Sequence, residues 1–198
     1  MVTPAESAPL DDDCALTRAA AAGDPHARTR FVTRVLPRTR NLVRYLVRDD
    51  VLADDLAQAA LIEALRSVGG YRGDAPLERW VDRITVRTTM AHLRRSREDA
   101  RVLVLRGEPA DDGAADPPAA ADPLLRRRLA AHLGRLKEER RVAVVMKVIG
   151  GFSLEEIAAV CEAPLNTIKD RLRVGREELR ASILADPALA HLARGMES

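Results

Sequence analysis

The stretch FSLEEIAAVCEAPLNTIKDRLRVGREEL, residues 152–179, decides the fold of the C-terminal half of this 198-residue chain. Ser153, followed by Glu156 three residues later, forms a capping box and predicts the start of a short helix. A break at 161–164 ends this helix, and a second helix is predicted to begin near Leu165. The stretch therefore predicts a helix-turn-helix unit. The apolar face of the second helix, at helical spacing, is formed by Ile168, Leu172, Gly175 and Leu179.

The opposite face of this second helix carries an amide, basic side chains and one carboxylate. Asn, Lys and Arg set against an apolar spine are what a helix needs in order to read the major groove of DNA. Helix pairs joined by a turn also occur in ordinary bundles, so the pattern alone leaves a role without DNA open. The outward residues are Asn166, Lys169, Asp170, Arg173 and Arg176.

Two more helices are predicted upstream of this unit. Asp122-Pro123 forms a helix start, and the helix that follows should cover about 124–136. A further helix should cover about 138–149, where a Gly pair ends it. Residues 107–123 are Gly, Ala, Asp and Pro with no apolar periodicity, which predicts a flexible linker.

The N-terminal half also predicts helices, because strong helix formers are common and runs of β-branched residues are absent. Pro37 should kink or break the second of these helices. Residues 1–12 are expected to be disordered. The predicted helices cover Cys14 to Ala22 with Asp12 or Asp13 as N-cap, Pro25 to about Arg48, Val51 to about Val68, and Pro76 to about Arg97. The third is expected to bury the side with Leu52, Leu56, Ala59, Ile62 and Leu65.

Charge is distributed unevenly along the chain, although the net charge is only +2. Residues 83–97 contain five arginines and no carboxylate, 107–123 are acidic, and 124–147 are basic again. Two basic blocks separated by an acidic spacer suggest two modules that bind a polyanion. The alternative, that these charges only solvate helix faces, stays open at this point.

Several classes of function are disfavoured by the sequence. Cys14 and Cys161 lie far apart without a CxxC context, which excludes the usual zinc spacings and a disulfide framework. We find no Gly-rich phosphate loop and no nucleophile–base constellation, so we expect no enzyme, no cofactor and no metal. The acidic N-terminus does not resemble a signal peptide, and no apolar run has the length of a membrane-spanning helix. We therefore expect a cytoplasmic protein without membrane insertion.

Two separate regions resemble one protein family. Asp54-Asp55-Leu56-Ala57-Gln58 is similar to region 2.2 of the sigma-70 family, and the segment from Tyr71-Arg72-Gly73 to Leu93-Arg94-Arg95 is similar to regions 2.3 and 2.4. Phe152 to Leu172 resembles region 4.2. The order, spacing and acidic linker resemble the extracytoplasmic-function (ECF) group, which has domains two and four only.

The resemblance implies an all-α fold of two helical domains joined by a flexible acidic linker. It also implies promoter-specific transcription initiation by RNA polymerase. The expected organisation is a disordered N-terminus at 1–12, sigma region 2 at 13–97, a linker at 98–123, sigma region 4 at 124–184 and a tail at 185–198.

The resemblance also implies partners and residues. The partners are the β′ clamp helices and β flap of core RNA polymerase, promoter DNA, and an anti-sigma factor. Polymerase binding falls to Asp54, Asp55, Gln58 and Glu63. Recognition of the −10 element falls to Tyr71, Arg72, Arg83, Arg87, His92, Arg94, Arg95 and Arg97. Recognition of the −35 element falls to Asn166, Thr167, Lys169, Asp170, Arg171, Arg173 and Arg176, although Arg176 could instead pair with a Glu on its own helix.

Some residues depart from the family pattern. Arg87 stands where the family usually has Asn, and Ala91 where it has Asp, which bears on the −10 element. The turn has Cys161-Glu162 where Gly is common, and Pro164 and Asp170 replace common Ser residues, which bears on the −35 element. Trp80 could stack on a base, but a core position is the better interpretation. A stand-alone helix-turn-helix regulator and a helical adaptor without DNA remain the alternative functions.

Overall fold

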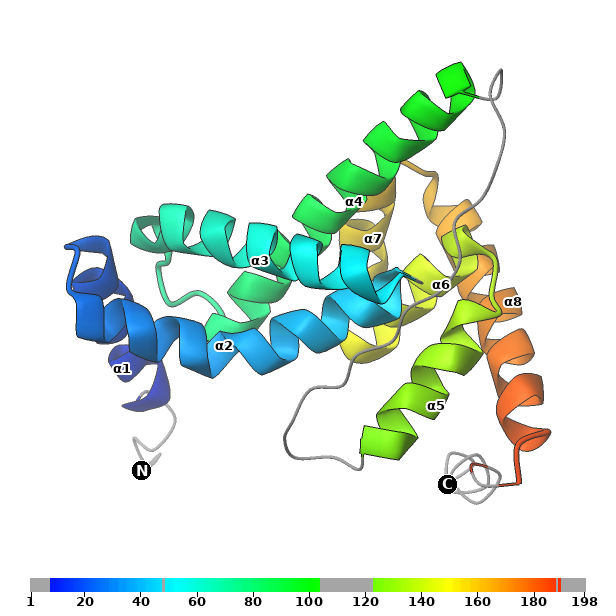
Figure 1. Ribbon diagram of the computed structural model, residues 1–198, viewed down its shortest axis with the longest axis horizontal. Helices are drawn as coiled ribbons and strands as arrows, with labels where there is room; N and C mark the ends of the chain where they lie inside the picture. The colour runs from blue at the N-terminus through cyan, green and yellow to red at the C-terminus, as the bar shows by residue number, and fades with distance from the viewer. Residues whose placement is uncertain (1–7, 48, 104–122, 188, 190–198) are drawn as a thin grey trace, which may run out of the picture. The chain divides into compact units, whose positions relative to one another are not determined.

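The computed structural model describes residues 8–47, 49–103, 123–187 and 189, and these residues form helices and turns without a strand (Figure 1). No helix in these ranges is both long enough and apolar enough to cross a membrane. The elements are α1 (Ala8–Ala21), α2 (Pro25–Leu46), α3 (Asp50–Ser67), a 3-10 turn (Val68–Gly70), α4 (Leu77–Leu103), α5 (Pro123–Gly134), α6 (Glu138–Val144), a π turn (Val145–Ile149), α7 (Leu154–Cys161) and α8 (Leu165–Leu184).

The described residues divide into two compact units. The first contains the residues up to Val43 and those from Val51 to the end of α4. The second contains 44–50 and the residues from α5 onward. Each unit has helices on all sides of its own apolar core, as the predicted all-α class requires.

The first helix begins earlier than predicted. α1 begins at Ala8, so residues 8–12 are helical rather than disordered, and Asp13 lies inside the helix instead of capping it. Asp13 is only 2% exposed. Its carboxylate accepts a hydrogen bond from the backbone N–H of Leu77 at 3.3 Å, at the start of α4, and another from Arg34 Nη1 at 2.5 Å. Partners this distant in sequence could not be seen in the local capping pattern.

The second helix is not broken by its proline. α2 runs as one helix through Pro37. A proline inside a helix costs about 3 kcal/mol because it removes a hydrogen bond and crowds the preceding turn. Phe31 and Val35 before it and Leu42 after it are all buried, and burial of such side chains contributes about 1.5–3 kcal/mol each. Packing on both sides of Pro37 therefore offsets its cost.

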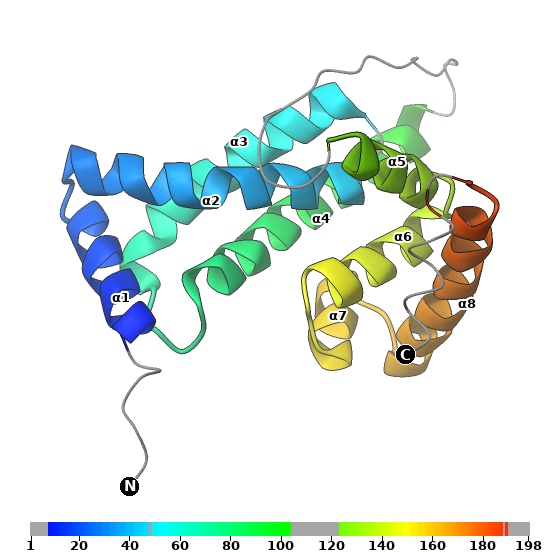
Figure 2. The ribbon, with the colours of Figure 1, turned by 90° about the horizontal axis from the view of Figure 1, so that it is seen from below.

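The core of the first unit joins α1, α2, α3 and the first turns of α4. Leu16, Phe31, Leu61 and Val81 are buried in one apolar cluster, one from each of these helices. Figure 2 shows α2 running lengthwise beside α3 and α4. Ion pairs reinforce the contact between α2 and α4: Arg34 binds Glu78 at 2.7 Å, and Arg38 binds Asp82 through two nitrogens at 2.7–3.0 Å.

The fourth helix is longer than predicted. α4 continues past Arg97 to Leu103, so the first residues of the expected linker at 98–123 are helical. Residues 98–103 include Glu, Ala, Arg and Leu, which are strong helix formers, and no Gly or Pro stops the helix. The rest of that linker, residues 104–122, lies outside the described residues.

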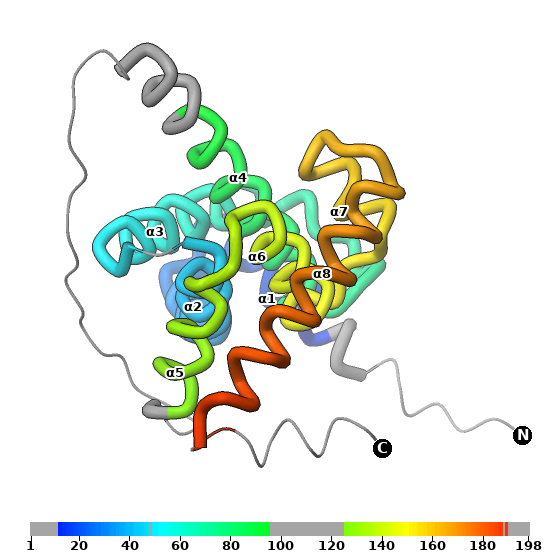
Figure 3. Tube along the Cα trace, turned by 90° about the vertical axis from the view of Figure 1, so that its right-hand side faces the viewer, coloured from blue at the N-terminus to red at the C-terminus, as the bar shows by residue number. Residues whose placement is uncertain are grey.

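The second unit is built around α8. α5, α6 and α7 all pack on this helix, and Figure 3 shows α6 lying against it. Gly175 allows the closest approach: a Cβ there would lie 2.9 Å from Val144 Cγ2 and 3.2 Å from Arg140 Cβ. The glycine within α8 is therefore a packing feature rather than a helix stop.

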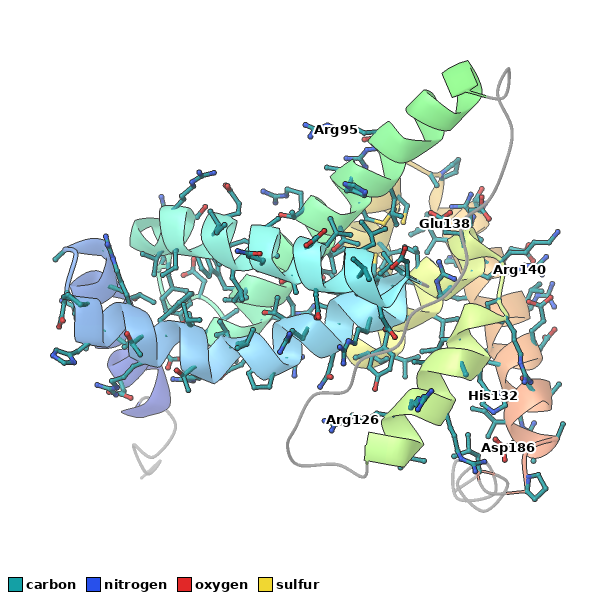
Figure 4. All side chains as sticks on the ribbon, in the orientation of Figure 1. Arg95, Arg126, His132, Glu138, Arg140 and Asp186 are labelled. Atoms are coloured by element: carbon teal, nitrogen blue, oxygen red, sulfur yellow. The ribbon has the colours of Figure 1, made fainter. Side chains whose placement is uncertain are left out.

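A cluster of polar side chains connects α5 with the C-terminal end of α8. The buried His132 lies 2.7 Å from Ser182 Oγ through Nδ1 and 3.1 Å from Asp186 Oδ2 through Nε2. Arg128 also binds Asp186, at 3.1 Å. Figure 4 shows His132 and Asp186 on their two segments. This cluster fixes the helix that presents the outward face described below.

Candidate functional site

The helix-turn-helix has the predicted start. Ser153 Oγ accepts from the N–H of Glu156 at 3.0 Å, and Glu156 Oε2 accepts from the N–H of Ser153 at 2.8 Å. This is the capping box expected from the sequence. It satisfies two backbone donors that would otherwise lack partners, and so fixes where α7 begins.

The turn contains an unusual backbone conformation. Glu162 ends α7 in the left-handed region, with φ 51° and ψ 44°, and its N–H donates to Ala158 O. This conformation favours Gly, because a residue without a Cβ adopts it without a steric clash. Pro164 then serves as the N-cap of α8 and supplies no side-chain hydrogen bond. The two departures noted in the sequence thus leave the turn intact.

The predicted two faces of α8 are present. Ile168, Leu172 and Gly175 are buried, as predicted. Thr167 and Arg171 lie at the margin and are half-buried. Asn166, Lys169, Asp170, Arg173, Arg176 and Glu177 are exposed, and we call these six residues the outward face of α8. Toward the end of the helix, Glu178, Arg180, Ala181 and Leu184 are exposed as well.

One arginine of the outward face is held by two carboxylates. Arg173 Nη2 donates to Asp170 Oδ1 at 2.9 Å, and Nη1 donates to Glu177 Oε1 at 3.1 Å. Hydrogen bonding to Asp170 and the charge of Glu177 raise the pKa of Arg173 above its ordinary value. The sequence suggested that Arg176 could form an ion pair with a Glu on its own helix. In the structure, Arg173 forms the ion pair with Glu177.

A second basic surface lies on α4. Arg83 and Arg87 are exposed one turn apart, and Arg95 projects from the helix into open space (Figure 4). His92 and Arg94 are half-buried. Arg72 is exposed in the loop before α4, while the side chain of Arg97 lies outside the described residues. The predicted −10 residues on α4 therefore include three exposed cations, Arg83, Arg87 and Arg95, and we call them the basic side of α4.

Tyr71 is an exception to the −10 prediction. It is 9% exposed, and its hydroxyl donates to the carbonyl of Ala75 at 2.7 Å. Burial and the neighbouring carboxylate of Asp13 raise the pKa of Tyr71 to about 12. Its ring lies edge-on to Trp80 with centroids 5.7 Å apart, and both rings pack on the core. Tyr71 is therefore a core residue here, and the expected core position of Trp80 is the one observed.

The predicted core face of α3 was partly wrong. Leu56 is buried and Leu65 packs against the core, as expected. Ala59 and Ile62 are exposed, Ile62 to 43%, and Val51 is exposed to 68%. The buried stripe instead comprises Ala53, Leu56, Ala57, Ala60, Leu61 and Ala64. Alanines at i, i+4, i+7 and i+11 let the helix pack closely, and this spacing could have identified the stripe from the sequence. The prediction assumed that a large apolar side chain such as Ile62 must be buried, whereas small alanines form most of the buried side.

The exposed side of α3 contains both apolar and polar side chains. Val51, Asp55, Gln58 and Ile62 follow one another at helical spacing, and we call them the α3 stripe. Glu63 is exposed beside it. Asp54 is different, because it is half-buried and bound to Arg40 at 3.3 Å. Sequence reasoning identified the polar members and missed Val51 and Ile62.

Two family models match this chain, each mainly within one of the two units. Residues 31–98 match the family model of sigma-70 region 2, which covers the α3 stripe and the basic side of α4. Residues 126–179 match the model of sigma-70 region 4, which covers the helix-turn-helix.

Two curated relatives and one solved structure extend this match. The chain is 30% identical to the RNA polymerase sigma-H factor of Pseudomonas aeruginosa over 166 residues, which cover 79% of this chain and 86% of that protein. It is 29% identical to the ECF RNA polymerase sigma-E factor of Escherichia coli, with the same coverage. The solved structure of CnrH in complex with the cytosolic domain of CnrY aligns with a TM-score of 0.54 and 25% identity, over 88% of this chain and 98% of that one. The chain belongs to the sigma-70 family of RNA polymerase sigma factors, in the ECF group, and acts in promoter-directed transcription initiation.

Proposed function

We propose that three exposed surfaces divide the work of a sigma factor in this chain. The α3 stripe docks on the β′ clamp helices of core RNA polymerase, the basic side of α4 holds the −10 element, and the outward face of α8 reads the −35 element. The observation that carries the proposal is the sidedness of α8, whose apolar residues are buried while its amide and basic residues face outward.

The α3 stripe supports docking because it mixes two kinds of contact. Val51 and Ile62 are large apolar side chains in water, and exposed apolar groups arranged together are typical of protein interfaces. Asp55 and Gln58 lie between them and suit a basic partner, whose approach they would steer. Asp54 contributes less directly, since Arg40 already occupies its carboxylate.

The α4 surface supports binding of a melted strand. Arg83, Arg87 and Arg95 are exposed cations, which neutralise phosphates, and guanidinium planes also stack on unpaired bases. Arg72 in the preceding loop adds to this set. Tyr71 supports the loop from the core instead of contacting DNA.

Partners beyond polymerase and promoter follow from the relatives. CnrH was solved in complex with the cytosolic domain of CnrY, and the sigma factor RpoE of Bartonella quintana in complex with the anti-sigma factor NepR. By analogy we propose that an anti-sigma factor covers the polymerase-binding surface of this chain. The β flap of polymerase is the proposed contact of the second unit. We propose that the chain has no catalytic activity of its own and works in the cytoplasm, where it meets polymerase.

A binding experiment with the full chain tests the docking surface. Asp55→Ala/Ile62→Ala removes one polar and one apolar member of the α3 stripe, and we expect at least about tenfold weaker binding to core polymerase, as for interface hot spots. Arg30→Ala/Thr33→Ala removes two exposed side chains of α2 and serves as the matched control.

Two outcomes would contradict the proposal. Equal loss of polymerase binding in both double variants would point to a general effect on the fold. Sequence-specific duplex binding that is independent of polymerase, with no effect of either double variant on it, would favour a stand-alone regulator. Unfolding followed by the fluorescence of Trp80, the single tryptophan, shows whether the first unit is intact.

A further inference from the structure

The outward face of α8 carries more negative charge than a phosphate-binding surface needs. Lys169, Arg173 and Arg176 supply three cations, and Asp170 and Glu177 supply two carboxylates on the same side. Arg180, one turn beyond Arg176, is a further exposed cation. Non-specific DNA binding depends almost entirely on neutralising phosphates. The two carboxylates offset part of this positive charge, so the face gains less affinity from phosphates and depends more on contacts with bases.

The two carboxylates lie on either side of the Arg173 guanidinium along the helix. Asp170 lies three residues before Arg173, and Glu177 lies four residues after it. Asp170 Oδ1 receives Nη2 at 2.9 Å, while both oxygens of Glu177 receive Nη1 at 3.1 and 3.2 Å. The three side chains are 66%, 61% and 63% exposed, in chain order.

Such pairs are easy to rearrange when DNA arrives. Exposed ion pairs contribute little to stability, because water and salt screen them. Arg173 can thus turn a nitrogen from a carboxylate to a base at little cost. Until then, the carboxylates restrict the guanidinium to the neighbourhood of the helix, which lowers the entropy lost on binding.

We propose that Asp170 and Arg173 read adjacent base pairs as one unit, with Arg173 on a guanine and Asp170 on a cytosine, while Glu177 positions the guanidinium. The inference rests on the proposed −35 role of α8. Arg pairs with guanine O6 and N7, and a carboxylate accepts from the N4 amino group of cytosine. Three residues span about 4.5 Å along a helix, close to the 3.4 Å between successive bases.

The carboxylates also act against wrong sites. Where the sequence offers no amino donor in the major groove, as at guanine or thymine, Asp170 meets only acceptors, a methyl group or phosphates and is repelled or unpaired. Specificity gained through such a penalty is as effective as specificity gained from a new attraction. The unit should therefore lower binding to unrelated DNA as well as select a particular step.

The test selects duplexes from a pool randomised over the upstream element, using holoenzyme assembled from core polymerase and the full chain. Asp170→Ala should relax the choice at one base pair about fivefold to tenfold, within the discrimination of a single base contact, and should increase binding to unrelated duplex. Asp170→Asn should move the selected base from cytosine to adenine, because Asn pairs with adenine N6 and N7. Arg173→Ala should remove the preference at the adjacent guanine.

Two further variants separate positioning from charge. Glu177→Gln should weaken the guanine preference a few-fold without changing which base is preferred at any position. Glu178→Gln removes the same charge from α8, but its carboxylate binds Arg140 on α6 instead of Arg173. It is the matched control and should leave the base preferences unchanged.

The outcomes separate this inference from the proposed function. If the wild-type holoenzyme selects an upstream element but Asp170→Ala and Asp170→Asn select the same bases, the reading unit is wrong and the −35 role stands. If Glu177→Gln and Glu178→Gln change selection equally, charge alone is responsible. If the wild-type holoenzyme selects no upstream element, the proposed −35 role itself fails.

Discussion

Glu162 is the one described residue other than Gly with a positive φ, at 51°. An L side chain in the left-handed region costs about 1–2 kcal/mol. We therefore expect Glu162→Gly to stabilise α7 and α8 by about 0.5–1 kcal/mol, after the entropy that Gly gains in the unfolded chain is deducted. Amide hydrogen exchange of these two helices measures the change directly.

The control for this change lies in the same helix. Glu155 is exposed in the first turn of α7. There the backbone is helical, and Glu155→Gly should destabilise α7 by up to about 1 kcal/mol. A loss of protection in Glu162→Gly similar to that in Glu155→Gly would show that the left-handed conformation carries no strain.

Gly175 gives the opposite expectation at the residue scale. Ala is the better helix former by about 1 kcal/mol, but a Cβ at this position would lie 2.9 Å from Val144 Cγ2. Overpacking typically costs about 1–3 kcal/mol, so Gly175→Ala should destabilise the second unit by up to about 2 kcal/mol. Urea unfolding followed by the circular dichroism of the full chain checks the sign.

Gly134 at the end of α5 is the matched position, because a Cβ there meets nothing within 4 Å. Gly134→Ala should be neutral or slightly stabilising. If both substitutions had the same effect on unfolding, the close contact between α6 and α8 would not be the reason that Gly175 is needed.

At the scale of elements, ion pairs brace α2 against α4. Burial alone would raise the pKa of Glu78, but the hydrogen bond and charge of Arg34 outweigh it and hold that pKa below its ordinary value of 4.5. The stability from this group is therefore present above pH 4.5 and is lost as the pH falls through the lower folded value. Glu78 is partly exposed, so its contribution should stay below about 1 kcal/mol.

Glu78→Gln should lower the unfolding free energy of the first unit near pH 7, and the difference from wild type should shrink to nothing at strongly acidic pH. Fluorescence of Trp80 in urea follows this unit alone. Glu63→Gln on the exposed side of α3 is the control and should leave the acid limb unchanged. A difference for Glu78→Gln that grows toward acid would contradict the assigned sign.

The elements also show what the sequence could predict. Helix positions followed from local signals such as the capping box at Ser153 and the Gly pair after residue 149, and these lie where expected. The buried side of α3 did not follow, because Ile62 is apolar yet exposed. Hydrophobicity alone does not distinguish a core residue from an interface residue.

Contacts between residues far apart in the sequence also could not be predicted. Nothing near Asp13 indicates that its carboxylate accepts from Leu77, 64 residues away. The same limit applies to Tyr71, whose burial depends on α1 and on the Trp80 ring. For the candidate site, the buried and exposed faces of α8 could be predicted from the sequence. The pairing of Arg173 with its two carboxylates could not, because it depends on side-chain rotamers that residue spacing does not decide.

At the scale of the whole molecule, the two units contain different candidate surfaces. The first contains the α3 stripe and the basic side of α4, and the second contains the outward face of α8. A regulator that acts alone on duplex DNA needs only the second set. The presence of both sets in one chain predicts that sequence-specific initiation depends on core polymerase and on each unit.

Run-off transcription from a promoter library, with core polymerase in the presence and absence of this chain, tests this claim most directly. We expect start sites that appear only with the chain and share upstream elements near −10 and −35. Asp55→Ala/Ile62→Ala should reduce transcription from all of these sites together, since it weakens polymerase docking, while Asp170→Asn should change which sites are used. Identical start sites with and without the chain would contradict the account.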